Sequence, residues 1–327
     1  MLISHLSESV RYTGRWAKLD DAAVTTAPGA YFELAFKGSA CDLMFNTDLN
    51  PEPVPRLYLQ LDGGAKIEAP VSRYMRVEAP DDGNHVVTVY YKGAMQDQQR
   101  WYAPLAGKIT FIGANADAEG ELPADDRKII EFIGDSITEG IWVDEEKHPY
   151  GSTFKNHRNM VFQNDSTATY AYLTAAALGM RPYIMGYGSV GLTKGGGGGV
   201  PKASEAYPYT YHNIPNESIG AEIIVINHGA NDKINGAELY LEEYEKFLDI
   251  VRQINPDATI IALSAFLGFC NDELGELIEE YNKSRGDNII YIDSAGWVPY
   301  EPIHPLREGH QTIAQLLTKE IREKLKL

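Results

Sequence analysis

The sequence predicts two consecutive folds, an antiparallel β-sandwich followed by an α/β domain with a parallel sheet. Two observations support this prediction. Hydrophobic residues alternate with a period of two up to about residue 113, whereas apolar strands alternate with helical patterns after about residue 128. A chain of 327 residues is also long enough for two domains. We therefore place the sandwich at residues 1–120 and the α/β domain at residues 121–327.

The N-terminal region contains short segments with the pattern of half-buried strands. Leucine occupies every second position in part of residues 56–61, and residues 31–36 and 85–91 read similarly. The sequences Asp62-Gly63-Gly64 and Asp82-Gly83-Asn84 are typical of turns. Short strands with close turns and no helical pattern favour an antiparallel sandwich, which we expect to be jelly-roll-like.

The polar, acidic stretch 114–127 contains a proline and is expected to be a linker. Beyond it, apolar runs alternate with segments that have hydrophobic residues at helical spacing. The expected strands are residues 128–133, 221–226, 258–263 and 288–292, and the chain closes on a helix that carries Ile313, Leu317, Ile321 and Leu325. This alternation implies parallel strands with both faces covered, and ligands in such sheets bind beyond the carboxyl ends of the strands.

Composition excludes several kinds of partner. The chain has 46 acidic and 29 basic residues and a formal net charge of −17, which disfavours nucleic acids, anionic membranes and polyanionic substrates. No run approaches the roughly 20 apolar residues of a membrane helix. The first ten residues have no signal-peptide pattern, and Cys41 and Cys270 are the only cysteines. We expect two free thiols, a cytoplasmic location and a neutral substrate.

The first expected strand of the second domain ends at Gly134-Asp135-Ser136. Taken alone, this sequence is a strand-to-helix turn with a capping residue. It also departs from the Gly-x-Ser-x-Gly elbow, because Thr138 stands where the second glycine belongs. Since a serine nucleophile needs a base and oxyanion donors, the rest of the chain decides between the two interpretations.

Three further polar blocks follow in the chain. A strand near Tyr183 leads into residues 186–191, the strand 221–226 leads into residues 227–232, and residues 301–305 precede the last helix. With Gly134-Asp135-Ser136, these four ordered blocks resemble those of SGNH (GDSL-type) hydrolases, whose catalytic domain has three layers around a parallel sheet. The preceding sandwich makes the organisation similar to that of the family 2 carbohydrate esterases.

This resemblance implies a role for each block. Ser136 is the nucleophile and His304 is its general base. The backbone N–H groups of Ser136 and Gly191, with the Asn231 side-chain amide, form an oxyanion hole that stabilises negative charge on the attacked carbonyl. Glu301 stands in place of the usual aspartate and would orient His304, unless a backbone carbonyl does so and leaves a Ser–His dyad. Asp135 is interpreted as a turn and cap residue.

Other motifs are weaker. Residues 186–191 have the form of a dinucleotide-binding fingerprint, but the five glycines 195–199 follow instead of a helix, and no Gly-Lys-Ser/Thr of a P-loop occurs. We expect this glycine run to form a mobile or close-packed loop beside the pocket. The eight histidines are scattered, so neither a metal site nor a cofactor is expected, and His228 and His310 are interpreted as packed residues.

Aromatic residues suggest where a substrate binds. Residues 207–215 are rich in tyrosine, which suits sugar rings, although packing against the domain explains them equally well. Trp142, Tyr209 and Trp297 are the candidate substrate-binding residues. The segments 142–164 and 186–216 lack the aliphatic runs of a lipase tunnel, which favours a short acyl group.

The resulting hypothesis is a serine esterase that removes O-acetyl groups from acetylated sugars or oligosaccharides through an acetyl-enzyme intermediate. A general short-chain esterase or thioesterase is the alternative within the same class. A non-catalytic glycan-binding protein is the alternative from a different class.

Overall fold

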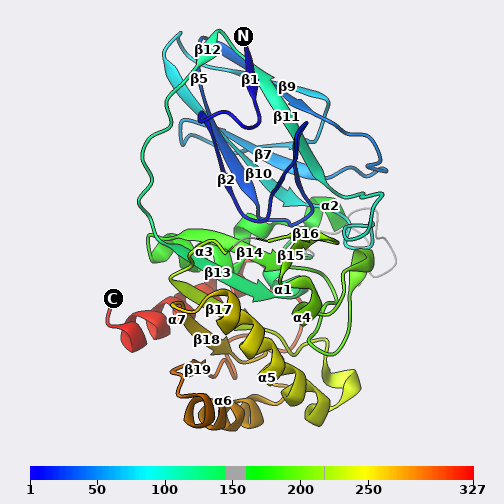
Figure 1. Ribbon diagram of the computed structural model, residues 1–327, viewed down its shortest axis with the longest axis vertical. Coiled ribbons are helices and arrows are strands. Elements are labelled where there is room, and N and C mark those ends of the chain that lie inside the picture. The colour runs from blue at the N-terminus through cyan, green and yellow to red at the C-terminus, as the bar shows by residue number, and fades with distance from the viewer. Residues whose placement is uncertain (145–159, 217) are drawn as a thin grey trace.

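The computed structural model describes residues 1–144, 160–216 and 218–327. Figure 1 shows a β-sandwich stacked on an α/β unit, with the N-terminus at the far end of the sandwich and the C-terminus beside helix α7. The predicted fold class, an antiparallel sandwich followed by a parallel sheet with helices, is confirmed. Residues 145–159 of the segment 142–164, for which we predicted an absence of lipase features, lie outside the described residues.

The sandwich consists of two antiparallel sheets. One has the order β3-β4-β11-β6-β9, with β1 paired to β11. Its strands are β1 (Leu2–Ser4), β3 (Ala17–Lys18), β4 (Ala23–Thr25), β6 (Ala40–Phe45), β9 (Tyr74–Glu78) and β11 (Ile109–Asn115). The other has the order β12-β5-β10-β7-β8, with β2 paired to β5. Its strands are β2 (Val10–Thr13), β5 (Tyr31–Lys37), β7 (Arg56–Leu61), β8 (Ile67–Pro70), β10 (Asn84–Gly93) and β12 (Ala118–Glu119).

Inward-facing aromatic residues hold the two sheets together. Phe32 of β5 stacks on Phe111 of β11 with ring centroids 4.2 Å apart, and Phe45 of β6 packs beside both. All three side chains are almost completely buried, and each contributes about 1.5–3 kcal/mol through burial of apolar surface. Of the three segments predicted as strands from alternation, β7 and most of β10 alternate between buried and half-buried residues, whereas β5 is almost entirely buried.

The predicted linker 114–127 is partly wrong. Asn115 still belongs to β11, and Ala118–Glu119 forms the edge strand β12, which pairs with Phe36 and Lys37 of β5. Two residues of pairing at a sheet edge are too short to produce a periodic pattern, so a polar composition concealed them. The connection without regular structure runs from Gly120 to Lys128.

The second unit is a five-stranded parallel sheet in the order β14-β13-β17-β18-β19. Its strands are β13 (Ile129–Gly134), β14 (Arg181–Gly186), β17 (Ile223–Asn227), β18 (Thr259–Leu263) and β19 (Ile290–Ile292), and a small hairpin joins β15 (Tyr209–Tyr211) to β16 (Ile214–Pro215). The α-helices are α1 (Ser136–Glu139), α2 (Met160–Gln163), α3 (Tyr170–Ala177), α4 (Ala203–Ala206), α5 (Ala237–Ile254), α6 (Asn271–Arg285) and α7 (Arg307–Leu325). The 3₁₀ turns are η3 (Ser166–Ala168), η4 (Gly197–Gly199) and η5 (Lys233–Asn235).

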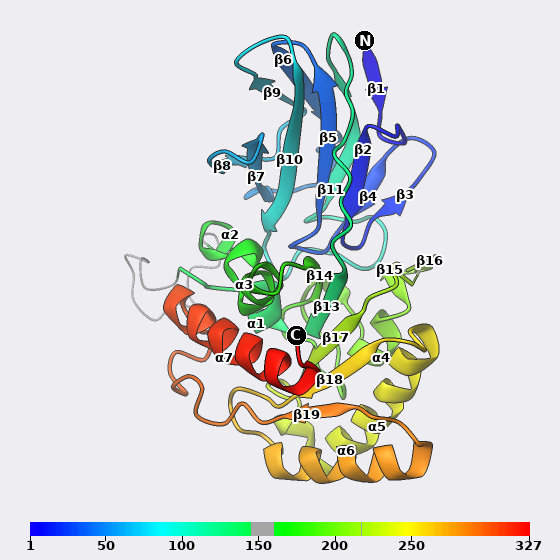
Figure 2. The same cartoon turned by 90° about the vertical axis from the view of Figure 1, so that its left-hand side faces the viewer.

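Helices cover both faces of this sheet. Helices α3 and α7 pack on the face that presents Ile130 and Phe132 of β13, whereas α4, α5 and α6 pack on the face that presents Ile133. Figure 2 shows the two groups of helices on opposite sides of the strands. Because both faces are covered, the polar groups of the loops gather at the ends of the strands.

Candidate active site

Strand register brings the predicted blocks together. Gly134, the last residue of β13, is paired with Gly186 of β14 on one side and with Asn227 of β17 on the other. The chain after each of these residues therefore starts at the same edge of the sheet. Ser136 stands two residues after Gly134, so the blocks at 186–191 and 227–232 flank the serine, as the sequence predicted.

Ser136 is held at the start of a short helix. It is the first residue of α1, and the carboxylate of Asp135 accepts a hydrogen bond of 2.9 Å from the Ile137 N–H as an N-cap. Oγ of Ser136 lies 2.9 Å from Nε2 of His304. A nucleophile within hydrogen-bonding distance of a base is the arrangement that acyl transfer requires.

The environment of His304 favours its neutral form. Its ring packs edge-on against the indole of Trp142, with centroids 5.1 Å apart. Burial of the imidazole lowers the pKa of His304 to about 4. A neutral imidazole at physiological pH can accept the proton of Ser136.

The structure does not bring Glu301 to His304. The residue is exposed, and among the described residues no hydrogen bond or ion pair joins its carboxylate to the imidazole. Residues 299–303 are all exposed, whereas His304 is half-buried. Neither of the two orienting groups that the sequence suggested, Glu301 or a backbone carbonyl, is bonded to the imidazole within the described residues, where the geometry is that of a Ser–His pair.

The three predicted oxyanion donors differ in their availability. The Ser136 N–H has no acceptor among the described residues. The Asn231 amide donates to Asp135 Oδ2 at 3.2 Å and to the Val190 carbonyl at 3.0 Å, so it is fixed beside the nucleophile. The Gly191 N–H donates to the Lys194 carbonyl at 3.0 Å and is thus engaged within its own turn. In this conformation Ser136 offers the unoccupied donor, Asn231 is adjacent, and the prediction for Gly191 is not met.

Asp135 is more than a turn residue. It is buried, and burial together with the nearby Asp232 raises the pKa of Asp135 to about 7. One oxygen of its side chain caps α1 and the other receives the Asn231 amide. Asp135 thereby links the nucleophile turn to the loop after β17.

The candidate substrate-binding residues separate into two groups. Trp142 contacts His304 and is a wall of the site. Tyr209 belongs to the β15–β16 hairpin, which lines a hollow with Ile129 and Arg181, the first residues of β13 and β14. Ser136 follows the opposite end of β13, so the described structure does not bring Tyr209 to the Ser–His pair. Trp297 packs on the core beneath α7, so Trp142 is the one of the three that the described structure brings to the Ser–His pair.

The remaining sequence interpretations concern packed residues. His228 and His310 are buried, and Nδ1 of His310 accepts a hydrogen bond from the Tyr170 N–H. Cys41 and Cys270 are free thiols.

Within the described ranges, no cluster of His, Cys, Asp or Glu could hold a metal ion, and no helix is long and apolar enough to cross a membrane.

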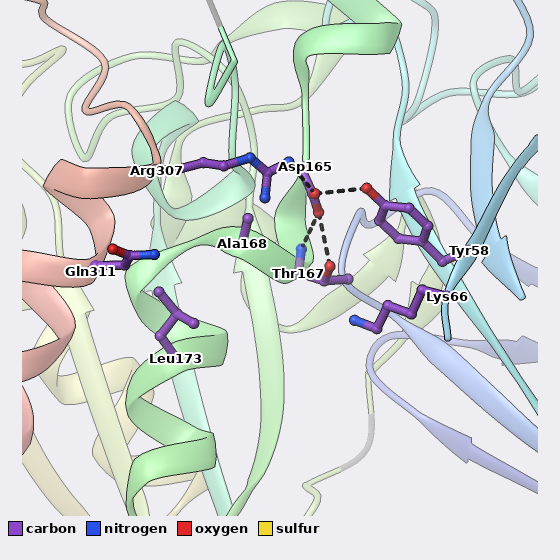
Figure 3. A pocket seen from close by; sticks show the side chains of 8 residues that line it. All are labelled: Tyr58, Lys66, Asp165, Thr167, Ala168, Leu173, Arg307 and Gln311. Carbon is purple, nitrogen blue, oxygen red and sulfur yellow. Dashed lines mark hydrogen bonds and ion pairs between the residues drawn. The ribbon is translucent and has the colours of Figure 1, made fainter. Parts of the chain in front are cut away.

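An arginine three residues after His304 anchors this segment. Arg307 forms a bidentate ion pair with Asp144 at 2.8 Å and a further bond of 2.9 Å to Asp165. Tyr58 of the sandwich donates to the same Asp165 carboxylate at 2.9 Å. Figure 3 shows Arg307 and Tyr58 approaching Asp165 from opposite sides, beside a hollow of about 400 Å³. Asp165 thus joins the sandwich to the start of α7.

Sequence reasoning missed two buried ion pairs. Arg15 pairs with Glu131 at 3.3 Å, and Arg100 pairs with Glu139 at 2.5 Å. Each arginine comes from the sandwich region and each glutamate from the strand–turn–helix that carries Ser136. A glutamate inside the apolar run 128–133 was the visible signal, because a charged residue on a buried strand requires a partner.

Comparison with known proteins agrees with this geometry. Residues 132–312, more than half of the chain, match the GDSL-like Lipase/Acylhydrolase family. The chain is 26% identical over 361 residues to an acetylxylan esterase / glucomannan deacetylase of Cellvibrio japonicus, covering 98% of this chain and 88% of that protein. It is 28% identical over 243 residues to the cellulase/esterase CelE of Acetivibrio thermocellus, covering 67% of this chain but only 28% of CelE.

Solved structures reproduce both units of the fold. A family two carbohydrate esterase from Cellvibrio japonicus superposes with a TM-score of 0.81 at 19% identity, covering 100% of this chain and 98% of the other. A family two carbohydrate esterase from Clostridium thermocellum, solved with cellohexaose, gives a TM-score of 0.77 at 23% identity over 97% and 99% of the two chains. The predicted class of carboxylic ester hydrolase is confirmed, and the chain belongs to the GDSL-like lipase/acylhydrolase family, with the overall fold of the family 2 carbohydrate esterases.

Proposed function

We propose that this protein removes acetyl groups from O-acetylated saccharides. The observation that supports this most directly is the 2.9 Å contact between Ser136 Oγ and His304 Nε2 at the carboxyl edge of the sheet. The family supplies the ester-hydrolase chemistry. Similarity to a protein named acetylxylan esterase / glucomannan deacetylase, over almost the whole chain, supports an acetylated saccharide as the substrate.

Acylation begins at the serine. Ser136 Oγ attacks the acetyl carbonyl carbon while His304 Nε2 takes the hydroxyl proton. Negative charge develops on the carbonyl oxygen, to which the Ser136 N–H would donate; this N–H has no other acceptor among the described residues, and the Asn231 amide lies adjacent. The tetrahedral intermediate then expels the sugar oxygen, which receives the proton from His304, and an acetyl group remains on Ser136.

Deacylation repeats the proton transfers in the same order. His304 takes a proton from water as the water oxygen attacks the acetyl carbon. It then returns this proton to Ser136 Oγ, and acetate leaves. The imidazole is neutral at the start of each half-reaction, which agrees with its low pKa of about 4.

Acetylated oligosaccharides provide the direct test of this function. The purified enzyme is incubated with acetylated xylo-oligosaccharides and gluco-oligosaccharides, and the stepwise loss of acetyl groups is followed by mass spectrometry. We expect stepwise deacetylation by the wild type and none by the S136A variant. Intact oligosaccharides after prolonged incubation, with an enzyme that hydrolyses simple acetate esters, would reject the saccharide as the substrate.

Acyl-chain preference separates this function from a general short-chain esterase. Each methylene that a small pocket cannot hold costs about 1–3 kcal/mol, or roughly 10–200-fold in kcat/KM. In the 4-nitrophenyl series we therefore expect acetate to be the best substrate, with a steep fall toward octanoate. An equal or rising kcat/KM at butyrate and octanoate would favour the general esterase.

The cytoplasmic location remains a prediction. Fractionation of cells that express the protein with its native coding sequence tests it: the prediction requires the protein in the soluble cytoplasmic fraction, and recovery from the medium or envelope would contradict it.

A further inference from the structure

We propose that Arg100 of the sandwich is a positioning residue for ester hydrolysis at Ser136. It acts through Glu139 on the loop that follows β14. The inference rests on the proposed function and assigns part of the catalytic geometry to a residue outside the segment that matches the family, which begins at residue 132.

Arg100 is buried within the α/β unit although it comes from the loop between β10 and β11. Figure 2 shows β10 ending at the α/β unit, where this loop begins. The side chain of Arg100 is 0% exposed, and its guanidinium bonds both oxygens of Glu139, at 2.5 and 3.3 Å. Among the described residues, Glu139 is the carboxylate that forms an ion pair with Arg100. A bidentate arginine–carboxylate pair fixes both the distance and the orientation of the carboxylate.

Glu139 in turn contacts the loop after β14. It ends the helix α1 that Ser136 begins, and its Oε2 accepts a hydrogen bond of 2.5 Å from the Gly188 N–H. Two residues later, the Val190 carbonyl accepts the Asn231 amide at 3.0 Å. A continuous set of bonds therefore runs from Arg100 through Glu139 to the loop that holds Asn231 beside the nucleophile.

The glycine run 195–199 is the surface on which the sandwich loop docks. The Arg100 N–H donates to the Gly198 carbonyl at 2.9 Å, and the Gly197 N–H donates to the Gly188 carbonyl at 2.8 Å. A Cβ atom at Gly197 would lie 2.5 Å from the Gln96 carbonyl oxygen, and one at Gly198 would meet the Gln98 carbonyl oxygen. Glycine is required because two backbones approach directly. The run is close-packed, one of the two states that the sequence predicted.

Arg15 offers a matched control. It is also fully buried, comes from the sandwich, and pairs with a glutamate of the nucleophile strand, Glu131. Its other bonds go to the carbonyls of Tyr207 and Tyr209, and the hairpin that begins at Tyr209 lies near the starts of β13 and β14. Loss of either arginine breaks a buried ion pair between the same two units, but only Arg100 leads to Gly188 and Asn231.

The experiment compares R100M and R15M in the full-length chain with 4-nitrophenyl acetate. Active sites are titrated with a fluorophosphonate so that kcat refers to folded, reactive serines, and the temperature is set where both variants remain folded by circular dichroism. We expect R100M to lower kcat about 10- to 100-fold with KM within about twofold of the wild type, because a shift of the loop that holds Asn231 beside Ser136 disturbs the geometry that the transition state requires. R15M should retain the wild-type kcat per titrated site.

Conservative variants keep the test decisive if R100M does not fold. R100K retains a charge but cannot form the two parallel bonds, and we expect a kcat between those of the wild type and R100M. E139Q retains an acceptor for the Gly188 N–H and should keep a higher kcat than E139A. A wild-type kcat for R100K together with equal rates for E139Q and E139A would overturn the proposal, as would equal losses of kcat in R100M and R15M.

The two proposals fail in different ways. If the wild type does not hydrolyse 4-nitrophenyl acetate, the esterase function itself is wrong. If the wild type is active and R100M has the same kcat and KM, the esterase function stands and only the positioning role of Arg100 is rejected.

Discussion

The two segments that carry Ser136 and His304 are built in opposite ways. Residues 130–143, which include Ser136, are all buried, and ion pairs from two sandwich arginines hold the glutamates on either side of the serine. Residues 299–303, which lead to His304, are all exposed. The nucleophile is thus fixed by the core, whereas the base is held by its contacts with Trp142 and Ser136 and by the Arg307 anchor.

This difference indicates which catalytic groups need a rigidly fixed position. The nucleophile and the oxyanion donors must match a developing charge closely, and the Arg100–Glu139 pair supports that preorganisation, whereas the Arg15–Glu131 pair supports the stability of the fold. A base needs only to reach the serine in its neutral form. Substitutions in the nucleophile segment are therefore expected to affect stability or kcat strongly, whereas the exposed part of the histidine segment should tolerate them.

The largest effect is expected at the nucleophile. S136A should lower kcat for 4-nitrophenyl acetate on the order of 10³-fold or more, because removal of a catalytic serine abolishes the acyl-enzyme route. Its melting temperature should stay close to that of the wild type, since one hydroxyl at the edge of the sheet is lost. A folded S136A variant that kept most of its activity would show that another group is the nucleophile.

The next largest effect concerns stability. R15M leaves the Glu131 carboxylate buried without its cation, and loss of one partner of a buried ion pair costs about 3–5 kcal/mol. Urea unfolding followed by fluorescence measures the change in the free energy of unfolding. Addition of E131Q to R15M should recover part of the loss, because no buried charge then remains unpaired. A cost below about 1 kcal/mol for R15M would mean that the frame around Ser136 does not depend on this pair.

The acid limb of the pH–rate profile probes the histidine segment. An imidazole with the ordinary pKa of 6.5 would be about 30-fold depleted in its neutral form at pH 5. Because burial lowers the pKa of His304 to about 4, kcat/KM should stay near its plateau at pH 5 and fall about tenfold per pH unit below pH 4. A midpoint between pH 6 and 7 would reveal a negative partner for the imidazole.

Stability changes over the same range and must be controlled. Burial lowers the folded-state pKa of His304 and His310 below 6.5, so the unfolded chain binds more protons between about pH 4 and 6.5 and these two residues make the fold less stable as the pH falls through that window. Circular dichroism at each pH identifies the range in which the loss of rate comes from protonation of His304 and not from unfolding.

The sequence predicted the fold and the Ser–His pair well because these depend on local patterns. Alternation located β5, β7 and β10, and apolar runs located β13, β17 and β18, whose parallel register then placed Ser136 beside residues 186–191 and 227–232. Side-chain partners across the two units could not be predicted in this way. Nothing in the local sequence of Arg100 indicates Glu139, 39 residues away, because that contact exists only after the sandwich docks.

The differences between the predicted and observed placements have the same origin. Tyr209 is predicted at the site because its tyrosine-rich segment suits sugar rings, but the hairpin that contains it lies near the starts of β13 and β14. Glu301 was assigned by its position before His304, yet three residues of an exposed loop do not determine the direction of a side chain. The position of a residue just after a buried strand therefore predicts where its side chain lies, whereas the position of a residue within an exposed loop does not.

The smallest effect is expected for E301A. If the base is held by Trp142 and Ser136, removal of an exposed carboxylate that makes no bond to the imidazole should leave kcat/KM within about twofold of the wild type, the range of ordinary surface substitutions. The same assay with H304A, in which we expect a loss comparable to that of S136A, shows that the method detects an impaired base.

Should E301A instead lose more than about tenfold in kcat/KM, the exposed loop must close during turnover and bring Glu301 to the ring. That closure has a second signature: a carboxylate beside the imidazole stabilises its charged form, so the acid limb of the wild type would lie well above pH 4 and would shift downward in E301A. Measuring both quantities on one pair of variants decides whether this enzyme works as a dyad or assembles a triad around its substrate.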